Sequence, residues 1–261
     1  MDYTFSARTD PGLRRRNNED AVIVDERRGV AVLADGMGGY NAGEVASGMA
    51  TTLIARELTR WLAASTAANS ADDICRILAT SVDSANQAIL HAARHNPDYK
   101  DMGTTLVAGI FHGDRLFLTH VGDSRCYRLR GGDLTQITKD HSMLQEQVDA
   151  GLIHREGSCV SSSRHILTRA LGVDPELQLE VKIHSVAAGD FYLMCSDGLT
   201  DMLDDASIAS LMGQENNIVK LASALINLAN AKGGRDNIAV ILIHAKDAPD
   251  QPGQSSRLFV C

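Results

Sequence analysis

Residues 29–39 read GVAVLADGMGG, in which a short apolar run leads directly into an acidic, glycine-rich turn. A short apolar run of this kind is typical of a buried β-strand. Asp35 therefore lies at the end of a strand, where a rigid scaffold can hold its carboxylate in place. The segment Gly36–Gly39 contains more glycine than a simple turn requires, so backbone carbonyls and amides could approach an ion or a phosphate closely.

Three further acidic clusters are scattered along the chain: Asn18-Glu19-Asp20, Ser196-Asp197-Gly198 and Asp236-Asn237. Taken singly, each is explained better as a turn, because the Asp or Asn side chain bonds its own backbone and glycine accepts positive φ. Asp197, like Asp35, follows an apolar strand-like run, which favours a metal site. Mg²⁺ and Mn²⁺ prefer oxygen ligands, and converging carboxylates would repel one another unless cations neutralised them.

The bulk composition is that of an ordinary globular protein. The chain has 261 residues, of which 44% are hydrophobic and 22% charged, so it can bury a substantial core. The formal net charge of −8 argues against a general nucleic-acid binder. Five cysteines without metal-ligand spacing favour reduced thiols in a cytosolic protein. With no visible signal peptide or membrane-spanning run, we expect a cytoplasmic monomer that binds neither nucleic acid nor membrane.

On either side of residues 29–34, the predicted strands and the predicted helices occur in separate runs along the sequence. Apolar patterns and turn residues predict further strands at residues 3–7, 21–24, 104–111, 116–121, 126–130, 134–137, 177–181, 191–194 and 238–243. Helices are predicted from about residue 43 and at 72–95, 142–150, 208–212 and 219–231. We interpret residues 154–165 as a mobile loop. This order favours an α+β fold over alternating β-α-β units. We expect one domain of residues 1–246 followed by a flexible tail of residues 247–261.

The acidic clusters belong to a longer ordered series of motifs. Along the chain these are Arg15, Asn18-Glu19-Asp20, Asp35-Gly36-Met37-Gly38-Gly39, Ala42-Gly43-Glu44, Gly103-Thr104-Thr105, Val121-Gly122-Asp123-Ser124-Arg125, Asp140-His141-Ser142, Ser196-Asp197-Gly198-Leu199 and Gly234-Arg235-Asp236-Asn237. In order and spacing the series resembles the metal-dependent protein phosphatases of the protein phosphatase 2C type, in their compact bacterial form. The resemblance implies a four-layer α-β-β-α sandwich, in which two antiparallel sheets are flanked by helices and the clusters converge at one end.

The resemblance also implies roles for the acidic residues. Asp35 would bridge two Mn²⁺ or Mg²⁺ ions, and the carbonyl of Gly36 would hold one of them. Asp197 and Asp236 would ligate the other ion, and Asp20 would help through bound water.

Further roles follow from the same resemblance. Arg15 matches the arginine that grips the substrate phosphate, so Arg15 and Asp35 are the candidate catalytic residues. Asp123 matches a residue that helps to bind a third, weaker ion. Met37 stands where many eukaryotic members carry a histidine proposed as the general acid. Water held by the ions could replace that acid, or His141 could, although a hydrogen-bonding role in its own loop suits His141 better.

The implied function is that of a Ser/Thr protein phosphatase. It would hydrolyse phosphoserine and phosphothreonine with a water activated by a binuclear metal centre, and it would oppose a bacterial Ser/Thr kinase. Its partners would be phosphorylated proteins, including that kinase and its substrates. The alternatives are a catalytically weak relative that binds phosphoproteins or senses a signal, and a phosphatase acting on small metabolites. Every matched ligand position remains acidic, which favours activity.

Overall fold

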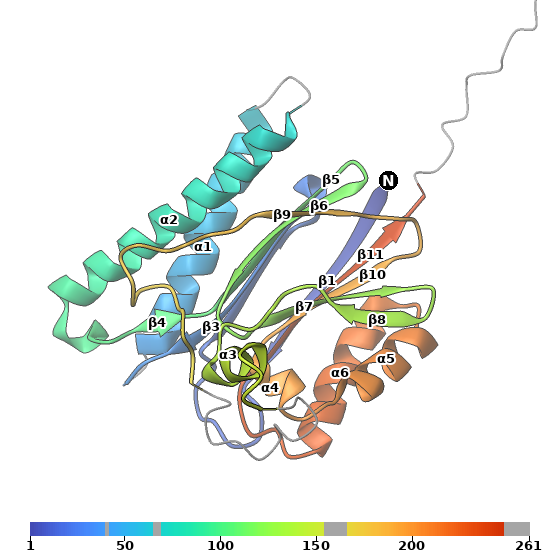
Figure 1. Cartoon of the computed structure of the whole chain (residues 1–261). Helices are drawn as coiled ribbons and strands as arrows, with labels where there is room; N and C mark the ends of the chain where they lie inside the picture. The colour runs from blue at the N-terminus through green and yellow to red at the C-terminus, as the bar shows by residue number, and fades with distance from the viewer. Residues whose placement is uncertain (40–41, 65–68, 154–165, 248–261) are drawn as a thin grey trace, which may run out of the picture.

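The computed structural model describes residues 1–39, 42–64, 69–153 and 166–247. Two antiparallel sheets face each other, and helices cover the outer side of each (Figure 1). Helices α1 (Ala42–Ala64) and α2 (Ala71–His95) cover one side, and α5 (Asp205–Gln214) and α6 (Ile218–Ala231) cover the other. The four-layer sandwich that the resemblance implies is thereby confirmed.

Sheet I has the strand order β1-β11-β10-β7-β8. Its strands are β1 (Asp2–Asp10), β11 (Ile238–Lys246), β10 (Phe191–Cys195), β7 (Arg125–Arg130) and β8 (Asp133–Gln136). Sheet II has the order β2-β3-β5-β6-β9, with β4 paired to the end of β3. Its strands are β2 (Asp20–Asp25), β3 (Val30–Met37), β5 (Leu106–His112), β6 (Arg115–Val121), β9 (Lys182–Ser185) and β4 (Gly103–Thr104). Shorter elements are η1 (Glu26–Arg28), η2 (Pro97–Tyr99), α3 (Met143–Asp149) and α4 (Asp197–Thr200).

The sequence of strand β3 is continuously apolar because both faces of the strand are buried. Val30, Val32 and Ala34 pack toward α1 and α2, whereas Ala31 and Leu33 pack between the two sheets. All five are fully buried. A strand buried on both faces has no polar alternation, and this fixes where the strand that carries Asp35 must lie.

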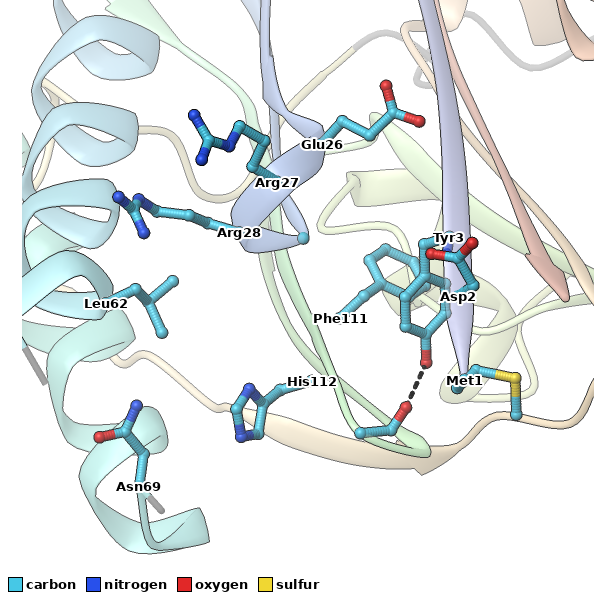
Figure 2. Close-up of a pocket in the computed structure, with 12 residues that line it drawn as sticks. Met1, Asp2, Tyr3, Glu26, Arg27, Arg28, Leu62, Asn69, Phe111 and His112 are labelled. Carbon is cyan, nitrogen blue, oxygen red and sulfur yellow. Dashed lines mark hydrogen bonds between the residues drawn. The ribbon is translucent and has the colours of Figure 1, made fainter. Parts of the chain in front are cut away.

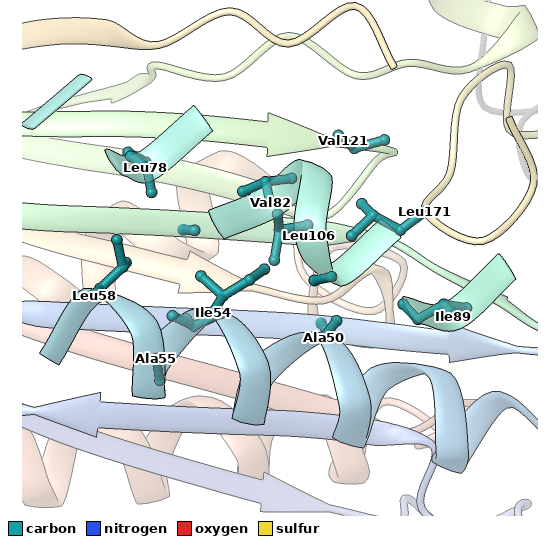
Figure 3. Close-up of a cluster of buried hydrophobic side chains, with 14 of the residues drawn as sticks. Ala50, Ile54, Ala55, Leu58, Leu78, Val82, Ile89, Leu106, Val121 and Leu171 are labelled. Carbon is teal, nitrogen blue, oxygen red and sulfur yellow. The ribbon is translucent and has the colours of Figure 1, made fainter. Parts of the chain in front are cut away.

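The two long helices attach to sheet II through a shared apolar core (Figure 3). Its side chains include Ala50, Ile54 and Leu58 of α1, Leu78, Val82 and Ile89 of α2, and Leu106 and Val121 of the sheet. Helix α2 begins after Ser70, whose side chain accepts a hydrogen bond from the amide of Asp73, a favourable N-cap. This packing fixes α1, whose first turn lies beside the acidic cluster.

One predicted strand is wrong. Residues 177–181 are not a strand, and β9 begins only at Lys182, which pairs with Leu118. Leu177, Leu179 and Val181 alternate because they pack against the α1–α2 core, not because the segment joins a sheet. A second difference is α4, a short helix that starts at Asp197, where the sequence indicated only a turn.

Strand β3 also continues three residues beyond the predicted run, through Asp35, Gly36 and Met37, because Gly36 and Met37 pair with β4. The other boundaries lie close to the predicted ones. Strand β11 ends at Lys246, the predicted end of the domain, although the division into domain and tail stays a prediction. The predicted mobile loop at 154–165 and the tail beyond residue 247 lie outside the described residues. Among the helices of the described ranges, none is both long and apolar enough to cross a membrane.

Candidate active site

Strand pairing brings the scattered acidic clusters to one end of the sandwich. In sheet II, Asp20 of β2 lies directly opposite Asp35 of β3. In sheet I, β10 and β11 are antiparallel, so the residues after Cys195 and those before Ile238 lie at the same edge. Asp197 and Asp236 are therefore neighbours in space, although 39 positions separate them in the sequence.

A cleft of about 660 Å³ opens at this end. All predicted site residues except Asp20 line it: Arg15, Asp35, Gly36, Asp123, Asp197 and Asp236. Other lining residues include Glu19, Met37, Thr105, Asp201, Met202 and Arg235. Asp20 lies behind the cleft surface and is only 8% exposed.

Two threonines hold the backbone of Asp35. Its amide donates to Thr105 Oγ1 at 3.1 Å, and its carbonyl accepts from the Thr105 amide at 2.8 Å and from Thr104 Oγ1 at 2.9 Å. The Thr105 hydroxyl is also hydrogen-bonded to Ser124 Oγ at 2.7 Å. The sequence signal was the Gly103-Thr104-Thr105 motif, but its contact with Asp35 is visible only in the fold.

Gly36 lies against the first turn of α1. A Cβ atom on Gly36 would be 2.1 Å from the carbonyl oxygen of Gly43, and one on Gly43 would be 2.9 Å from the carboxylate of Glu19. The Gly36 amide donates to the Glu19 carbonyl at 3.1 Å. Only glycine fits at both positions, and their contact fixes the position of Asp35 relative to α1.

One carboxylate oxygen of Asp20 has no hydrogen-bond partner within the described part of the chain. Its Oδ2 accepts a 2.7 Å hydrogen bond from Ser196 Oγ, which itself accepts from the amide of Ala239 at 2.9 Å. Its Oδ1 is buried and has no hydrogen-bond partner among the described residues. A buried oxygen left unpaired beside Asp35 suits a bound water or cation, because buried polar atoms otherwise lose their solvation.

Burial and mutual repulsion raise the pKa values of the acidic residues. Burial, as the main cause, raises the pKa of Asp20 to about 7 and that of Asp123 to about 8. The pKa of Asp35 is raised well above its ordinary value, also chiefly by burial. Four carboxylates add to this effect on Asp35: Asp20, Asp197, Asp123 and Asp236. Bound cations would favour the charged forms and relieve this repulsion.

Arg15 reaches the same group of carboxylates. Its Nη2 donates to Asp236 Oδ2 at 2.8 Å, and this hydrogen bond raises the pKa of the arginine. The side chain of Arg15 is 55% exposed, so its guanidinium remains open to the cleft.

Asn237 ties down the segment that carries Arg15. Its Nδ2 donates to the carbonyls of Pro11 and Asn17 at 3.0 and 2.8 Å, and its Oδ1 accepts from the Glu19 amide at 2.8 Å. The sequence placed Asn237 beside a metal-ligand candidate but gave no sign of this role.

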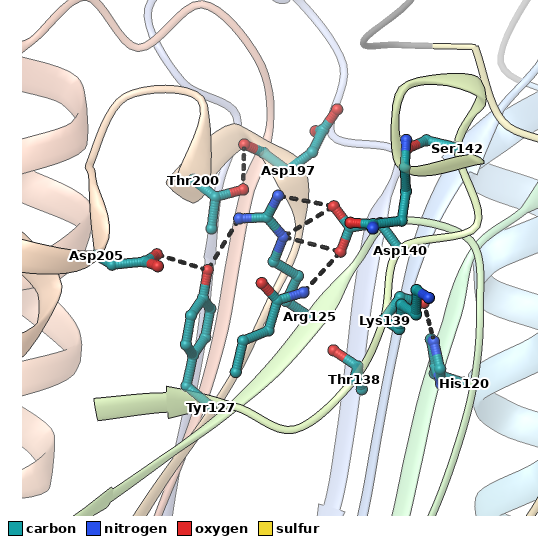
Figure 4. Close-up of polar contacts among 12 residues, drawn as sticks. His120, Arg125, Tyr127, Thr138, Lys139, Asp140, Ser142, Asp197, Thr200 and Asp205 are labelled. Atoms are coloured by element: carbon teal, nitrogen blue, oxygen red, sulfur yellow. Dashed lines mark hydrogen bonds and ion pairs between the residues drawn. The ribbon is translucent and has the colours of Figure 1, made fainter. Parts of the chain in front are cut away.

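A partly buried hydrogen-bond network supports the loop of Asp123 (Figure 4). Arg125 Nε and Nη2 bind the carboxylate of Asp140 at 2.7–3.1 Å, and Nη1 donates to Tyr127 Oη at 2.9 Å. Tyr127 donates in turn to Asp205 at the start of α5, at 3.1 Å. The network connects the Asp123 loop to sheet I and α5.

His141 lies outside the cleft. Its Nδ1 accepts from the Gly122 amide at 3.2 Å, and its ring stacks on His120 at 4.6 Å. Burial, as the main cause, lowers the pKa of His141 to about 4, so the ring is neutral at pH 7. These contacts favour the loop-positioning role over proton donation to a substrate, whereas Met37 does line the cleft.

The residues present fit a group of hard cations, although they do not form a closed cage. Across the described ranges, no three His, Cys, Asp or Glu side chains come close enough to hold one ion. The implied ligand set also uses the Gly36 carbonyl and water, and Mg²⁺ commonly keeps several waters and binds few carboxylates. The unpaired oxygen of Asp20 and the raised carboxyl pKa values support the fit.

A second hollow, of about 360 Å³, lies at the opposite end of the sandwich (Figure 2). Tyr3 and Phe111 line it together with Arg27, Arg28 and His112. Among its described lining residues only Asp2 and Glu26 carry carboxylates, so the more acidic cleft remains the candidate active site.

Comparison with known proteins identifies the family. The family profile described as Protein phosphatase 2C matches residues 14–242. The chain therefore belongs to the protein phosphatase 2C family.

Named relatives cover nearly all of the chain. The serine/threonine protein phosphatase PstP of Mycobacterium tuberculosis is 40% identical over 243 residues, which is 93% of this chain but 45% of that protein. The serine/threonine phosphatase stp of Listeria innocua is 36% identical over 90% of this chain and 93% of its own length. A crystal structure of the PstP catalytic domain in complex with two manganese ions matches with a TM-score of 0.83 at 39% identity, covering 94% of this chain and 99% of that one.

Proposed function

We propose that this chain is a metal-dependent phosphatase that hydrolyses phosphoserine and phosphothreonine in proteins. The main support is the convergence of Asp20, Asp35, Asp123, Asp197 and Asp236 beside an open arginine, on a protein phosphatase 2C fold. The match to a manganese-bound relative adds independent support.

Asp35, the Gly36 carbonyl, Asp197 and Asp236 would hold two ions, and Asp20 would orient water through its unpaired oxygen. When bound, the ions would supply an activated water and neutralise charge on the phosphoryl group. Mn²⁺ and Mg²⁺ both suit these oxygen ligands. We assign a third, weaker ion to Asp123.

Arg15 would bind the substrate phosphate. Its guanidinium offers paired donors that match phosphate oxygens. The tether through Asn237 keeps the segment of Arg15 next to Asp236, so the arginine reaches the cleft without an ordering step.

The proton for the leaving oxygen would come from water. Met37 lines the cleft, but a thioether cannot donate a proton, and His141 is engaged elsewhere. We extend the proposal to phosphorylated proteins and a Ser/Thr kinase as partners, while the monomeric state and the cytoplasmic location stay predictions.

The test compares wild type with Asp35→Asn. Hydrolysis of p-nitrophenyl phosphate and of a phosphothreonine peptide is measured with Mn²⁺ and with a chelator. We expect strong activity only for metal-loaded wild type. Asp133→Asn, an exposed aspartate on β8, is the matched control and should behave as wild type.

Two outcomes would contradict the proposal in different ways. Activity that survives both chelation and Asp35→Asn would exclude the metal mechanism. Folded, metal-loaded wild type that binds phosphopeptides in calorimetry without hydrolysing them would favour the binding relative.

A further inference from the structure

A second arginine, Arg235, lines the cleft and has no polar partner in the described ranges. Arg235 follows Gly234 and precedes Asp236, and its side chain is exposed. Arg15 is bonded to Asp236, whereas Arg235 makes no hydrogen bond or ion pair with any residue that the structure describes. An arginine that stays unpaired in a cleft rich in carboxylates is available to a ligand.

The stem of Arg235 lies close to Gly233. A Cβ atom on Gly233 would be 3.8 Å from Cγ and 4.0 Å from Nε of Arg235, and 3.7 Å from Sδ of Met202. The stem of Arg235 and the thioether of Met202 therefore both lie next to Gly233, and Met202 also lines the cleft. Its backbone is anchored, because the Gly234 carbonyl accepts from the Leu13 amide at 2.7 Å and the Gly234 amide donates to Ala229.

Arg15 and Arg235 differ in the anionic group that each can bind. The interior of the cleft is acidic, and Arg15 and Arg235 are the cations among its described lining residues. Arg15 already serves the scissile phosphate in the proposed function. Arg235 is thus left for an anionic group elsewhere on the same substrate.

We propose that Arg235 is a specificity-determining residue that binds a second anionic group, a carboxylate or a phosphate, on a residue close to the phosphorylated one. The inference rests on the proposed phosphatase function and names its preferred substrates as acidic or multiply phosphorylated segments. An extended chain advances about 3.3–3.6 Å per residue, so a side chain a few positions away can reach the rim. Arg235 takes no part in the chemical step.

The experiment measures kcat/KM for three phosphothreonine peptides that differ only at flanking positions. These carry alanine, glutamate, or a non-hydrolysable phosphonate analogue of phosphothreonine. For each protein variant, kcat/KM for an anionic peptide is divided by kcat/KM for the neutral peptide, and this ratio is compared at low and high salt. Because exposed ion pairs are weak, wild type should prefer the anionic peptides by roughly threefold to fivefold at low salt.

Three variants complete the design. Arg235→Gln should bring the ratio to about one, and Arg235→Lys should restore part of it. Arg14→Gln, an exposed arginine of the nearby segment that does not line the cleft, should keep the wild-type ratio. The thermal midpoint with Mn²⁺ shows whether each variant is folded and loaded.

The outcomes separate the two proposals. A wild-type ratio of one, or a preference that persists in Arg235→Gln, overturns the role of Arg235 while hydrolysis of the neutral peptide still supports the phosphatase. If wild type hydrolyses none of the peptides, the proposed function itself fails. A preference for only glutamate or only phosphonate identifies which anion the arginine selects.

Discussion

At the scale of single residues, Asn237 holds the segment that carries Arg15 through its side-chain hydrogen bonds. It is 6% exposed, and the three hydrogen bonds of its side chain all go to backbone groups of residues 11–19. Replacing it removes these hydrogen bonds from the carbonyls of Pro11 and Asn17 and from the amide of Glu19, so we expect effects on both stability and substrate binding.

We therefore predict that Asn237→Ala lowers the free energy of unfolding by about 2–3 kcal/mol and raises KM. The loop of Arg15 loses its tether, so phosphate binding requires an ordering step. Urea unfolding and steady-state kinetics measure the two effects. Asn216→Ala, at an exposed position before α6, is the control and should change neither. An unchanged KM in a destabilised Asn237→Ala protein would limit Asn237 to a structural role.

At the scale of elements, the contact between β3 and α1 sets the geometry of the cleft. Gly36 and Gly43 touch through their backbones, so the helix approaches the strand as closely as main chains allow. Helix α1 also contains Gly48, around which a Cβ atom would meet nothing within 4 Å. Replacing glycine by alanine therefore has opposite physical consequences at Gly43 and at Gly48.

Gly43→Ala should weaken Mn²⁺ binding and destabilise the protein, because the new methyl group would overlap Gly36 and Glu19. Gly48→Ala, the matched control, should raise stability by about 0.5–1 kcal/mol through helix propensity. Thermal unfolding measures the stability of both variants, and calorimetric titration measures their Mn²⁺ affinity. Equal Mn²⁺ affinity in the two would show that the Gly36–Gly43 contact does not shape the site.

At the scale of the whole molecule, folding forces several carboxylates into one small space. Asp20 and Asp123 have folded pKa values of about 7 and 8, against an ordinary 3.8. The folded form holds these protons more tightly than the unfolded chain does. The stability that the protonated carboxyl groups of Asp20 and Asp123 contribute is therefore fully present below pH 3.8 and is lost as the pH rises through 7 to 8.

It follows that Mn²⁺ should stabilise the protein more at pH 8 than at pH 6. At pH 6 the ion must displace protons from these carboxyl groups. Each displaced proton weakens Mn²⁺ binding by up to about 1.4 kcal/mol for every pH unit below the pKa of its group. The difference in melting temperature between Mn²⁺ and chelator, recorded at both pH values, measures this effect. Asp20→Asn should reduce the pH dependence. A difference that is the same at both pH values would contradict the linkage.

Much of this molecule could be predicted from local sequence. Helix α2 was predicted nearly in full from its helical apolar spacing, and the continuous apolar run at 29–34 predicted β3 except for its last three residues. The segment 177–181 was mispredicted because packing on a helix core also produces alternation. The hydrogen-bond partners of Asn237 and Thr105 could not be predicted, since they lie 220 and 70 positions away.

The sequence by itself determined the chemical inventory of the site: carboxylates at strand ends, glycines that permit close approach, and an arginine ahead of them in an ordered series of motifs. Tertiary structure alone decided that Asp20 faces Asp35, that Asn237 holds the Arg15 segment, that His141 lies outside the cleft and that Arg235 stands unpaired at its rim. Residue types and their local pattern follow from the chain, whereas proximity between distant segments depends on strand register and on the packing of the two sheets.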